Sequence, residues 1–264
     1  MLVSERRRRV VAQVQRQGSA SVTELAALLG VSGMTIRRDL DALSADGLLD
    51  KVHGGATVRR PPSTEELGFE ETSQRARSEK GAIAARARAL VRPGMSIGLS
   101  GGSTTWALAQ ALREVPDLTL VTNSLRIAEE FHHSSAQQAV ILTGGVRTPS
   151  DALVGPVAVR ALQVLHCDLV FLGVHGIDEH AGFTTPNIME AETNRALVET
   201  GQEVVVLADH SKWGRVGLTT IVDLDAVDHL VTDDQMPPDA VQTLREHIGT
   251  VDLVSTTPGA DPAG

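Results

Sequence analysis

The chain of 264 residues has 33 acidic and 24 basic side chains, and 42% of its residues are hydrophobic, so it can bury one large core beside a smaller domain. The single cysteine, Cys167, excludes an intrachain disulfide, and no apolar run has the length of a membrane span or the position of a signal peptide. We therefore expect a cytoplasmic protein, and the 2% aromatic content disfavours a single-strand nucleic-acid platform of stacked rings.

Charge is divided unevenly along the chain. Residues 1–60 contain ten Lys and Arg against six Asp and Glu, a net charge of +4, whereas the remainder contains 14 against 27, a net charge of −13. A basic amino-terminal segment on an acidic body is typical of a duplex-binding domain attached to a soluble sensor. A solvated charged face is the alternative interpretation.

Three short helices are predicted in the first 45 residues. The first covers residues 6–15, where valines recur at helical spacing. Ser21 to Glu24 match the capping-box pattern that begins a second helix, which ends at Gly30. Ser32 can cap the third helix, whose predicted buried side consists of Ile36, Leu40 and Leu43.

The third helix places two adjacent arginines away from its buried side. At 100° per residue, Arg38 lies opposite the apolar stripe, and Thr35 and Arg37 lie on its flanks. Two short helices joined by a tight turn form the helix-turn-helix layout, in which the second helix enters the major groove. An arginine there can pair bidentately with guanine, which discriminates between bases by roughly 1–3 kcal/mol.

A hairpin is predicted over residues 48–58, directly after the third helix. Gly54-Gly55 is a candidate two-residue turn because both residues tolerate positive φ. The hairpin would make the motif a winged helix and bring Lys51 and His53 near the phosphates. For His53, an exposed hairpin residue without a role is the alternative.

A break in composition at residues 59–64, which contain two prolines, separates this head from the body. We expect a winged helix-turn-helix domain at 1–58, a linker at 59–75, an effector-binding sensor domain at 76–255 and a disordered tail at 256–264. The body alternates short apolar runs with helical patterns, which predicts a mainly parallel α/β sheet. The expected strands are 95–99, 118–122, 139–143, 169–173, 203–208 and 229–232, and the expected helices are 104–112, 124–131, 157–165 and 190–199.

Ligands of such sheets bind at the carboxyl ends of the strands, and the residues there are small and polar. The loop after the first strand opens a helix, so its amides and hydroxyls predict an anion site, although a plain glycine-serine turn is the alternative. It is not a nucleotide-binding P-loop, because no Gly-Lys-Ser/Thr follows. Lys212 and Glu192 could equally be solvated surface residues. The predicted effector site consists of Ser100, Gly101, Gly102, Ser103, Thr104, Thr105, Asn123, Gly145, Asp178, Glu192, Asp209 and Lys212.

The stretches SGMTIRRDL and KVHGGA together resemble the head of the DeoR family of bacterial transcription regulators. GGSTT, VTNS, LTGG, GIDEHAGFTT and ADHSKWG extend the resemblance to nearly the whole chain. It implies a body similar in fold to ribose-5-phosphate isomerase that senses a phosphorylated sugar or related metabolite, and Asp39 paired within the head. Lys51 stands where arginine is common in the family. The residues expected to contact DNA are Ser32, Thr35, Arg37, Arg38, Lys51 and His53.

One departure bears on catalysis. The isomerase carries a Lys-Gly-Gly-Gly loop, whereas residues 178–186 contain no lysine, so binding without turnover is the preferred interpretation. A sugar-phosphate isomerase with a DNA-binding appendage is the alternative. No cofactor is expected, and the spacing of His166, Cys167, His175 and His180 fits no structural zinc site. The expected function is repression of carbohydrate-metabolism genes by a homo-oligomer, because operators are usually symmetric.

Overall fold

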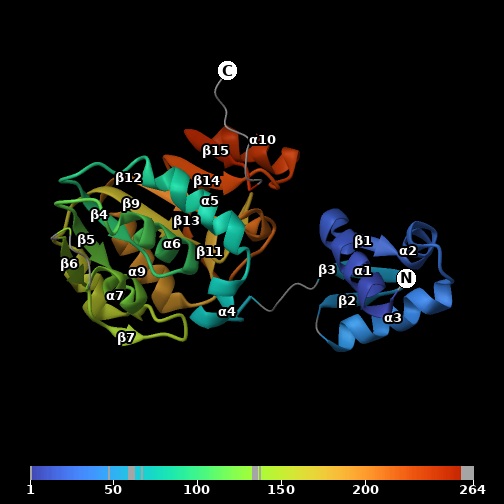
Figure 1. Cartoon of the computed structure of the whole chain (residues 1–264). Coiled ribbons are helices and arrows are strands. Elements are labelled where there is room, and N and C mark those ends of the chain that lie inside the picture. The colour runs from blue at the N-terminus through green and yellow to red at the C-terminus, as the bar shows by residue number, and fades with distance from the viewer. Residues whose placement is uncertain are drawn as a thin grey trace, which may run out of the picture. The chain divides into compact units, whose positions relative to one another are not determined.

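The computed structural model describes residues 2–46, 48–58, 63–66, 68–132, 136 and 138–256, and it forms two compact units, Met1–Pro62 and Ser63–Gly264 (Figure 1). The expected disordered tail lies outside the described residues except for residue 256, and so do residues 59–62 and 67 of the expected linker. Among the helices that are described, none is both long enough and apolar enough to cross a membrane.

The first unit packs three helices against a small sheet. The three helices form where the sequence predicts them, and each begins or ends within a few residues of its predicted bounds. The inward-facing side chains of the helices form one core together with Leu49. This core includes Val10, Val14, Leu25, Ile36, Leu40, Leu43 and Leu49, all 3% exposed or less. The elements are α1 (Val3–Gln17), β1 (Ser19–Ser21), α2 (Val22–Leu29), α3 (Gly33–Ala45), β2 (Leu49–Val52) and β3 (Gly55–Val58).

The predicted hairpin forms, but the predicted turn residues are wrong by one position. Val52 pairs with Gly55, so the two turn residues are His53 and Gly54, and Gly54 has a φ of +81°. Gly55 belongs to β3, where the unpredicted strand β1 pairs alongside in the order β1-β3-β2. A Cβ atom on Gly55 would lie 2.3 Å from the Ala20 carbonyl oxygen. The second glycine is therefore needed for close strand approach and not for the turn.

The second unit is built on a seven-stranded sheet in the order β15-β14-β12-β9-β4-β5-β6. Every neighbouring pair is parallel, as the alternation of strands and helices predicts. Six of these strands match predicted ones, and β15 at one edge was not predicted. The strands are β4 (Ser96–Leu99), β5 (Thr119–Thr122), β6 (Ala139–Leu142), β9 (Cys167–Gly173), β12 (Gly201–Leu207), β14 (His229–Asp233) and β15 (Thr250–Val254).

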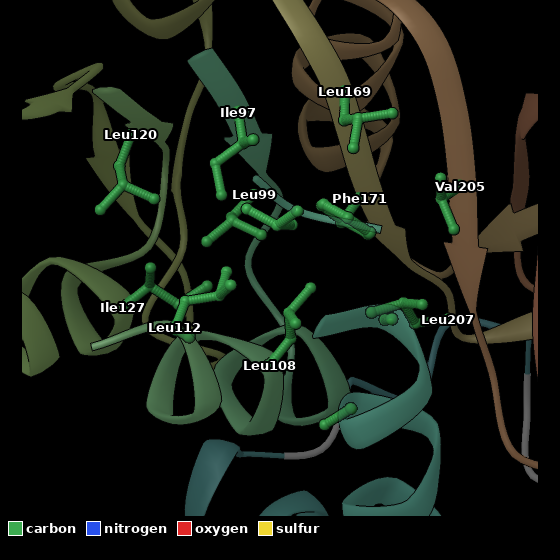
Figure 2. Close-up of a cluster of buried hydrophobic side chains, with 14 of the residues drawn as sticks. Ile97, Leu99, Leu108, Leu112, Leu120, Ile127, Leu169, Phe171, Val205 and Leu207 are labelled. Atoms are coloured by element: carbon green, nitrogen blue, oxygen red, sulfur yellow. The ribbon is translucent and has the colours of Figure 1, made fainter. Parts of the chain in front are cut away.

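Helices cover both faces of this sheet. On one face, Leu99 and Phe171 pack with Leu108 and Leu112 of the helix that follows β4, as Figure 2 shows. On the other face, strand residues such as Leu172 pack against the later helices. Strand side chains alternate between faces, so β9 contributes Phe171 to one core and Leu172 to the other. The helices are α4 (Phe69–Gln74), α5 (Arg77–Arg88), α6 (Ser103–Leu112), α7 (Leu125–His132), α8 (Pro156–Leu162), α9 (Ile188–Val198) and α10 (Pro238–His247).

Smaller elements complete the second unit. One antiparallel sheet has the order β10-β11-β13, and a hairpin of two short strands lies after β6. Two 3-10 helices follow β12 and β13. These elements are β7 (Val146–Arg147), β8 (Leu153–Val154), β10 (Gly176–Asp178), β11 (Gly182–Thr185), β13 (Thr219–Val222), η1 (His210–Lys212) and η2 (Leu224–Ala226).

Candidate effector cavity and nucleic-acid interface

The order of the strands places a cavity at the centre of the sheet. From β4 the chain proceeds to β5 and β6 on one side, whereas β9, β12, β14 and β15 lie on the other side. The loops after β4 and β9 separate at this switch point, where open α/β sheets bind ligands. A cavity of about 130 Å³ is found there. Its walls include Glu66, Thr72, Arg75, Lys80, Gly101, Gly102, Ser103, Thr104, Gly173, His175, Thr185, Glu190, Asn194, Asp209, Ser211, Lys212 and Arg215.

The loop after β4 is held from behind and offers its backbone to the cavity. Asn123 Oδ1 accepts a hydrogen bond from the Gly101 amide at 2.8 Å, and Ser100 Oγ accepts one from the Gly173 amide at 2.9 Å. Thr105 Oγ1 donates to the Ser100 carbonyl at 2.7 Å. Within the described chain no side chain caps α6, so the amides of its first turn remain available to a ligand. Free amides at a helix N-terminus favour an anion.

Four cationic side chains share the cavity with this helix start. Arg75, Lys80, Lys212 and Arg215 all line the cavity. Burial lowers the pKa of Lys80 to about 8, and burial also lowers the pKa of Lys212 and of Arg215, while the Asp209 carboxylate opposes each shift. A group whose charged form is destabilised by burial gains from an incoming opposite charge. The cavity is therefore suited to an anionic ligand.

The Lys80 ammonium also fixes the corner between α4 and α5. Its Nζ donates to the carbonyl of Thr72 at 2.5 Å and to that of Arg75 at 2.7 Å. Between the two helices, Ala76 has a φ of +47°, which is unfavourable for a residue with a Cβ. These contacts set the position from which Arg75 reaches the cavity.

The loop that carries Lys212 is fixed by two aspartates. Asp209 Oδ1 accepts a hydrogen bond from the Ser211 amide at 3.1 Å and begins η1. Asp233, at the end of β14, accepts from the His210 amide and pairs with the His210 ring, both at 2.8 Å. The hydrogen bond to Asp233 raises the pKa of His210. Trp213 follows Lys212 directly and forms a β-bridge with Ile177, so the loop is tied to β10 as well.

Hydrogen-bond acceptors of Glu66, Glu190 and Asn194 form another part of the cavity wall. Burial, together with the nearby Glu66 carboxylate, raises the pKa of Glu190 to about 7. Thr185 Oγ1 donates to Glu190 Oε2 at 3.0 Å. His175 adds no positive charge at neutral pH, because burial and the neighbouring cations lower its pKa to about 4. The cavity thus combines cations with carboxyl and amide acceptors.

The structure brings together half of the predicted effector residues. Gly101, Gly102, Ser103, Thr104, Asp209 and Lys212 line the cavity. Ser100, Thr105 and Asn123 lie behind the loop and hold it in place through the hydrogen bonds described above.

Three predicted effector residues lie elsewhere, and Glu192 requires a correction. Gly145, at φ +125°, packs against the Val154 backbone, and Asp178 Oδ1 accepts hydrogen bonds from the His180 and Ala181 amides in the β10–β11 turn. Glu192 is exposed, whereas Glu190 lines the cavity. Residues two positions apart in a helix point in directions about 200° apart, so Glu192 points away from the cavity when Glu190 faces it.

Several cavity residues were not predicted. Their segments approach the cavity only through tertiary packing. The unpredicted residues include Glu66, Arg75, Lys80, Glu190, Asn194 and Arg215.

In the first unit, the predicted DNA-contacting residues lie on α3 and the hairpin. Arg37 and Arg38 are exposed, as are Lys51 and His53. Lys51 Nζ pairs with Asp41 of α3. The outward direction of the two arginines agrees with the predicted helical face.

The start of α3 and its buried aspartate are fixed by local contacts. Ser32 Oγ caps α3 by accepting from the Thr35 amide at 3.2 Å. Asp39 is 2% exposed and pairs with Arg6 at 2.6 Å and with Arg7 at 3.3 Å, which confirms its predicted pairing within the head.

Comparisons with known proteins match two domain models to this chain, one within each of its two units. A DeoR-like helix-turn-helix domain model matches residues 6–61, and a DeoR C-terminal sensor domain model matches residues 75–234. The HTH-type transcriptional regulator GlpR of Haloferax volcanii is 36% identical over 241 residues, 91% of this chain and 93% of that protein. The glycerol-3-phosphate regulon repressor of Escherichia coli K12 is 28% identical over 247 residues, 94% of this chain and 97% of that protein.

Among solved structures, ribose 5 phosphate isomerase A from Neisseria gonorrhoeae is 16% identical with a TM-score of 0.38. The match covers 52% of this chain and 53% of the isomerase, so the chain spans about half of that enzyme.

Proposed function

The chain belongs to the DeoR family of DNA-binding transcription regulators, and on that premise we propose that it represses carbohydrate-metabolism genes under control of a phosphorylated sugar or related metabolite. The observation that carries this proposal is the cavity at the switch point of the sheet. It combines the uncapped start of α6 with four cations, which suits a phosphate, and with acceptors that suit hydroxyl groups. The relative from Escherichia coli K12 is named for a glycerol-3-phosphate regulon.

The first unit supplies the DNA contacts in this proposal. Residues 1–58 act as the winged helix-turn-helix domain, with α3 in the major groove and the β2–β3 hairpin beside the phosphates. The net charge of +4 over residues 1–60 supports attraction to duplex DNA. The proposed contacts are Ser32, Thr35, Arg37, Arg38, Lys51 and His53.

We propose that the protein is cytoplasmic and that it forms a homo-oligomer. The homo-oligomer is expected because symmetric operators are read by paired domains. An exposed apolar edge of the sheet supports self-association. Val140, Ile141 and Leu142 of the edge strand β6 are 36%, 38% and 40% exposed. Edge strands of monomeric proteins usually carry charges that prevent pairing, and β6 carries none.

The experiment that tests the proposal is an operator titration by electrophoretic mobility shift, with and without added sugar phosphates. In the wild type, at least one sugar phosphate is expected to change the operator affinity, with a coupling of about 1–3 kcal/mol. Thr104→Ala combined with Lys212→Ala is expected to abolish the change and leave the affinity of the unliganded protein intact. A normal response in the double variant would place the effector elsewhere.

A second candidate, sugar-phosphate isomerisation, has one observation in its favour. Glu190 has a pKa of about 7, which is suited to a general base, and it shares the cavity with Lys212. The relatives from Haloferax volcanii and Escherichia coli K12 are named as a regulator and a repressor, which favours binding without turnover. Incubation of the purified protein with pentose and hexose phosphates separates the two candidates. Isomer formation that disappears in Lys212→Ala would establish the enzyme.

A further inference from the structure

The segment that leads into the second unit contributes to the cavity. Only residues 59–62 separate Val58, the last residue of β3, from Ser63, the first residue of the second unit. Glu66 lies three residues further along and lines the cavity. A cavity residue is therefore close in sequence to the DNA-binding unit. We refer to residues 63–66 as the connecting segment.

Two hydrogen bonds attach the connecting segment to the cavity wall. The Leu218 amide donates to the Ser63 carbonyl at 2.9 Å, and Asn187 Nδ2 donates to Glu66 Oε2 at 3.1 Å. Leu218 follows the loop that carries Arg215, and Asn187 caps the helix whose first turn carries Glu190. The connecting segment is thus hydrogen-bonded to two residues, Leu218 and Asn187, that lie within three positions of cavity-lining residues.

The other carboxylate oxygen of Glu66 is an unsatisfied acceptor. Glu66 Oε1 is shielded from solvent and has no hydrogen-bond partner among the described residues. Asn194 Oδ1 is in the same condition, so two of the four such atoms found in the described part of the chain belong to residues of this one cavity. A buried acceptor without a partner costs free energy that a ligand donor would recover. These two atoms therefore indicate a ligand with hydroxyl donors.

We infer that Glu66 accepts a hydrogen bond from a hydroxyl of the effector whose anionic group binds at the start of α6, so that the effector acts directly on the connecting segment. The inference rests on the proposed function and names its route of regulation. A hydroxyl bonded to Glu66 Oε1 adds a third attachment of the connecting segment. Inorganic phosphate has no sugar hydroxyl to place there, so it occupies the cationic part of the cavity without engaging the segment. Coupling requires this difference between bound states.

The test uses the full chain and four probes: inorganic phosphate, glycerol 3-phosphate, glucose 6-phosphate and fructose 6-phosphate. Calorimetry gives the Kd of each, and hydrogen–deuterium exchange follows the connecting segment. In the wild type, at least one of the three phosphate esters, which carry hydroxyl groups, is expected to slow exchange over residues 63–66. Inorganic phosphate is expected not to do so. Glu66→Gln keeps an oxygen for Asn187 and replaces the unsatisfied acceptor by a donor. It is expected to raise the Kd of that compound about tenfold or more and to leave the Kd of inorganic phosphate unchanged.

Glu114→Gln is the matched control, because it makes the same substitution at an exposed residue of the second unit that does not line the cavity. It is expected to behave as the wild type. If Glu66→Gln binds the hydroxylated phosphate as tightly as the wild type, and the compound still changes operator affinity, the inference is wrong and the proposed function stands. If no probe changes the operator affinity of the wild type, the proposed function fails and the inference fails with it.

Discussion

Glu190 and His175 occupy one cavity, and burial moves their pKa values in opposite directions. Burial destabilises the charged form of each group, so the pKa of Glu190 rises to about 7 and that of His175 falls to about 4. At neutral pH the imidazole is uncharged and the carboxyl is partly protonated. The positive charge of the cavity is therefore supplied by lysine and arginine, which is suited to a ligand that remains anionic at physiological pH.

The shift at Glu190 predicts a pH-dependent effect on stability. In the native state the carboxyl keeps its proton up to about pH 7, whereas its ordinary pKa is 4.5. Between these values the native state binds more protons than the unfolded state, so this group makes the free energy of unfolding fall as pH rises. As pH rises from about 5 to about 8, the free energy of unfolding of Glu190→Gln is therefore expected to increase relative to that of the wild type. Urea unfolding of both proteins at both pH values measures the difference.

Glu192→Gln is the control for this prediction, because Glu192 is exposed on the same helix. Its difference from the wild type is expected to be the same at both pH values. If Glu190→Gln also shows no change between them, Glu190 is ionised in the native protein at the lower pH.

At this scale, the sequence predicted the backbone of the site and missed much of its wall. The loop at residues 100–105 was found because polar residues directly follow a buried strand, which is a local pattern. Arg75 and Glu66 come from segments that reach the cavity only through packing of the connecting segment, α4 and α5. Glu192 was expected at the cavity but is exposed, and Glu190 lines the cavity instead, because tertiary packing decides which face of α9 points inward.

At the scale of elements, α2 begins with a complete capping box. Ser21 Oγ accepts from the Glu24 amide at 3.1 Å, and Glu24 Oε2 accepts from the Ser21 amide at 2.8 Å. The backbone hydrogen bond from Ser21 lowers the pKa of Glu24. This motif was readable because a cap needs only residues three positions apart. Strand β1 was not readable, because three residues become a strand only when β3 lies beside them.

The capping box predicts a local loss of stability. Ser21→Ala removes the acceptor of the Glu24 amide and is expected to destabilise the first unit by about 0.5–2 kcal/mol. Amide hydrogen exchange over residues 3–45 measures this loss, and exchange in the second unit is expected to stay unchanged. Ser19→Ala, an exposed position in β1, is the matched control. Equal exchange rates in the Ser21 and Ser19 variants would contradict the role of the cap.

At the scale of the whole molecule, the two units differ in net charge and in proposed role. The division of charge at residue 60 was visible in composition alone, and the alternation of elements predicted the parallel sheet. The order of its strands was not predictable from one sequence, because long-range pairing leaves no local signal. That order nevertheless determines where the cavity lies, since the loops after β4 and β9 diverge only when these strands are neighbours.

Recognition of DNA by the first unit predicts separate effects of charge and of one arginine. The affinity for operator DNA is expected to fall steeply as salt rises, because neutralised phosphates release counterions. Arg38→Ala is expected to weaken operator binding about tenfold or more and to leave effector binding unchanged. Arg92→Ala, an exposed position in the second unit, is the control for loss of charge. Unchanged operator affinity in Arg38→Ala would contradict the assignment of α3.

The position of Trp213 beside Lys212 gives the protein an optical reporter of its own. The chain has two tryptophans and no tyrosine, and both indoles, Trp106 and Trp213, belong to the second unit. Trp106 is packed edge-on against Phe69 and donates to Glu130, whereas Trp213 follows a cavity residue. Tryptophan fluorescence of the intact chain therefore originates in the second unit. We expect binding of a metabolite beside Lys212 to change the emission of Trp213, so that binding can be measured without a dye.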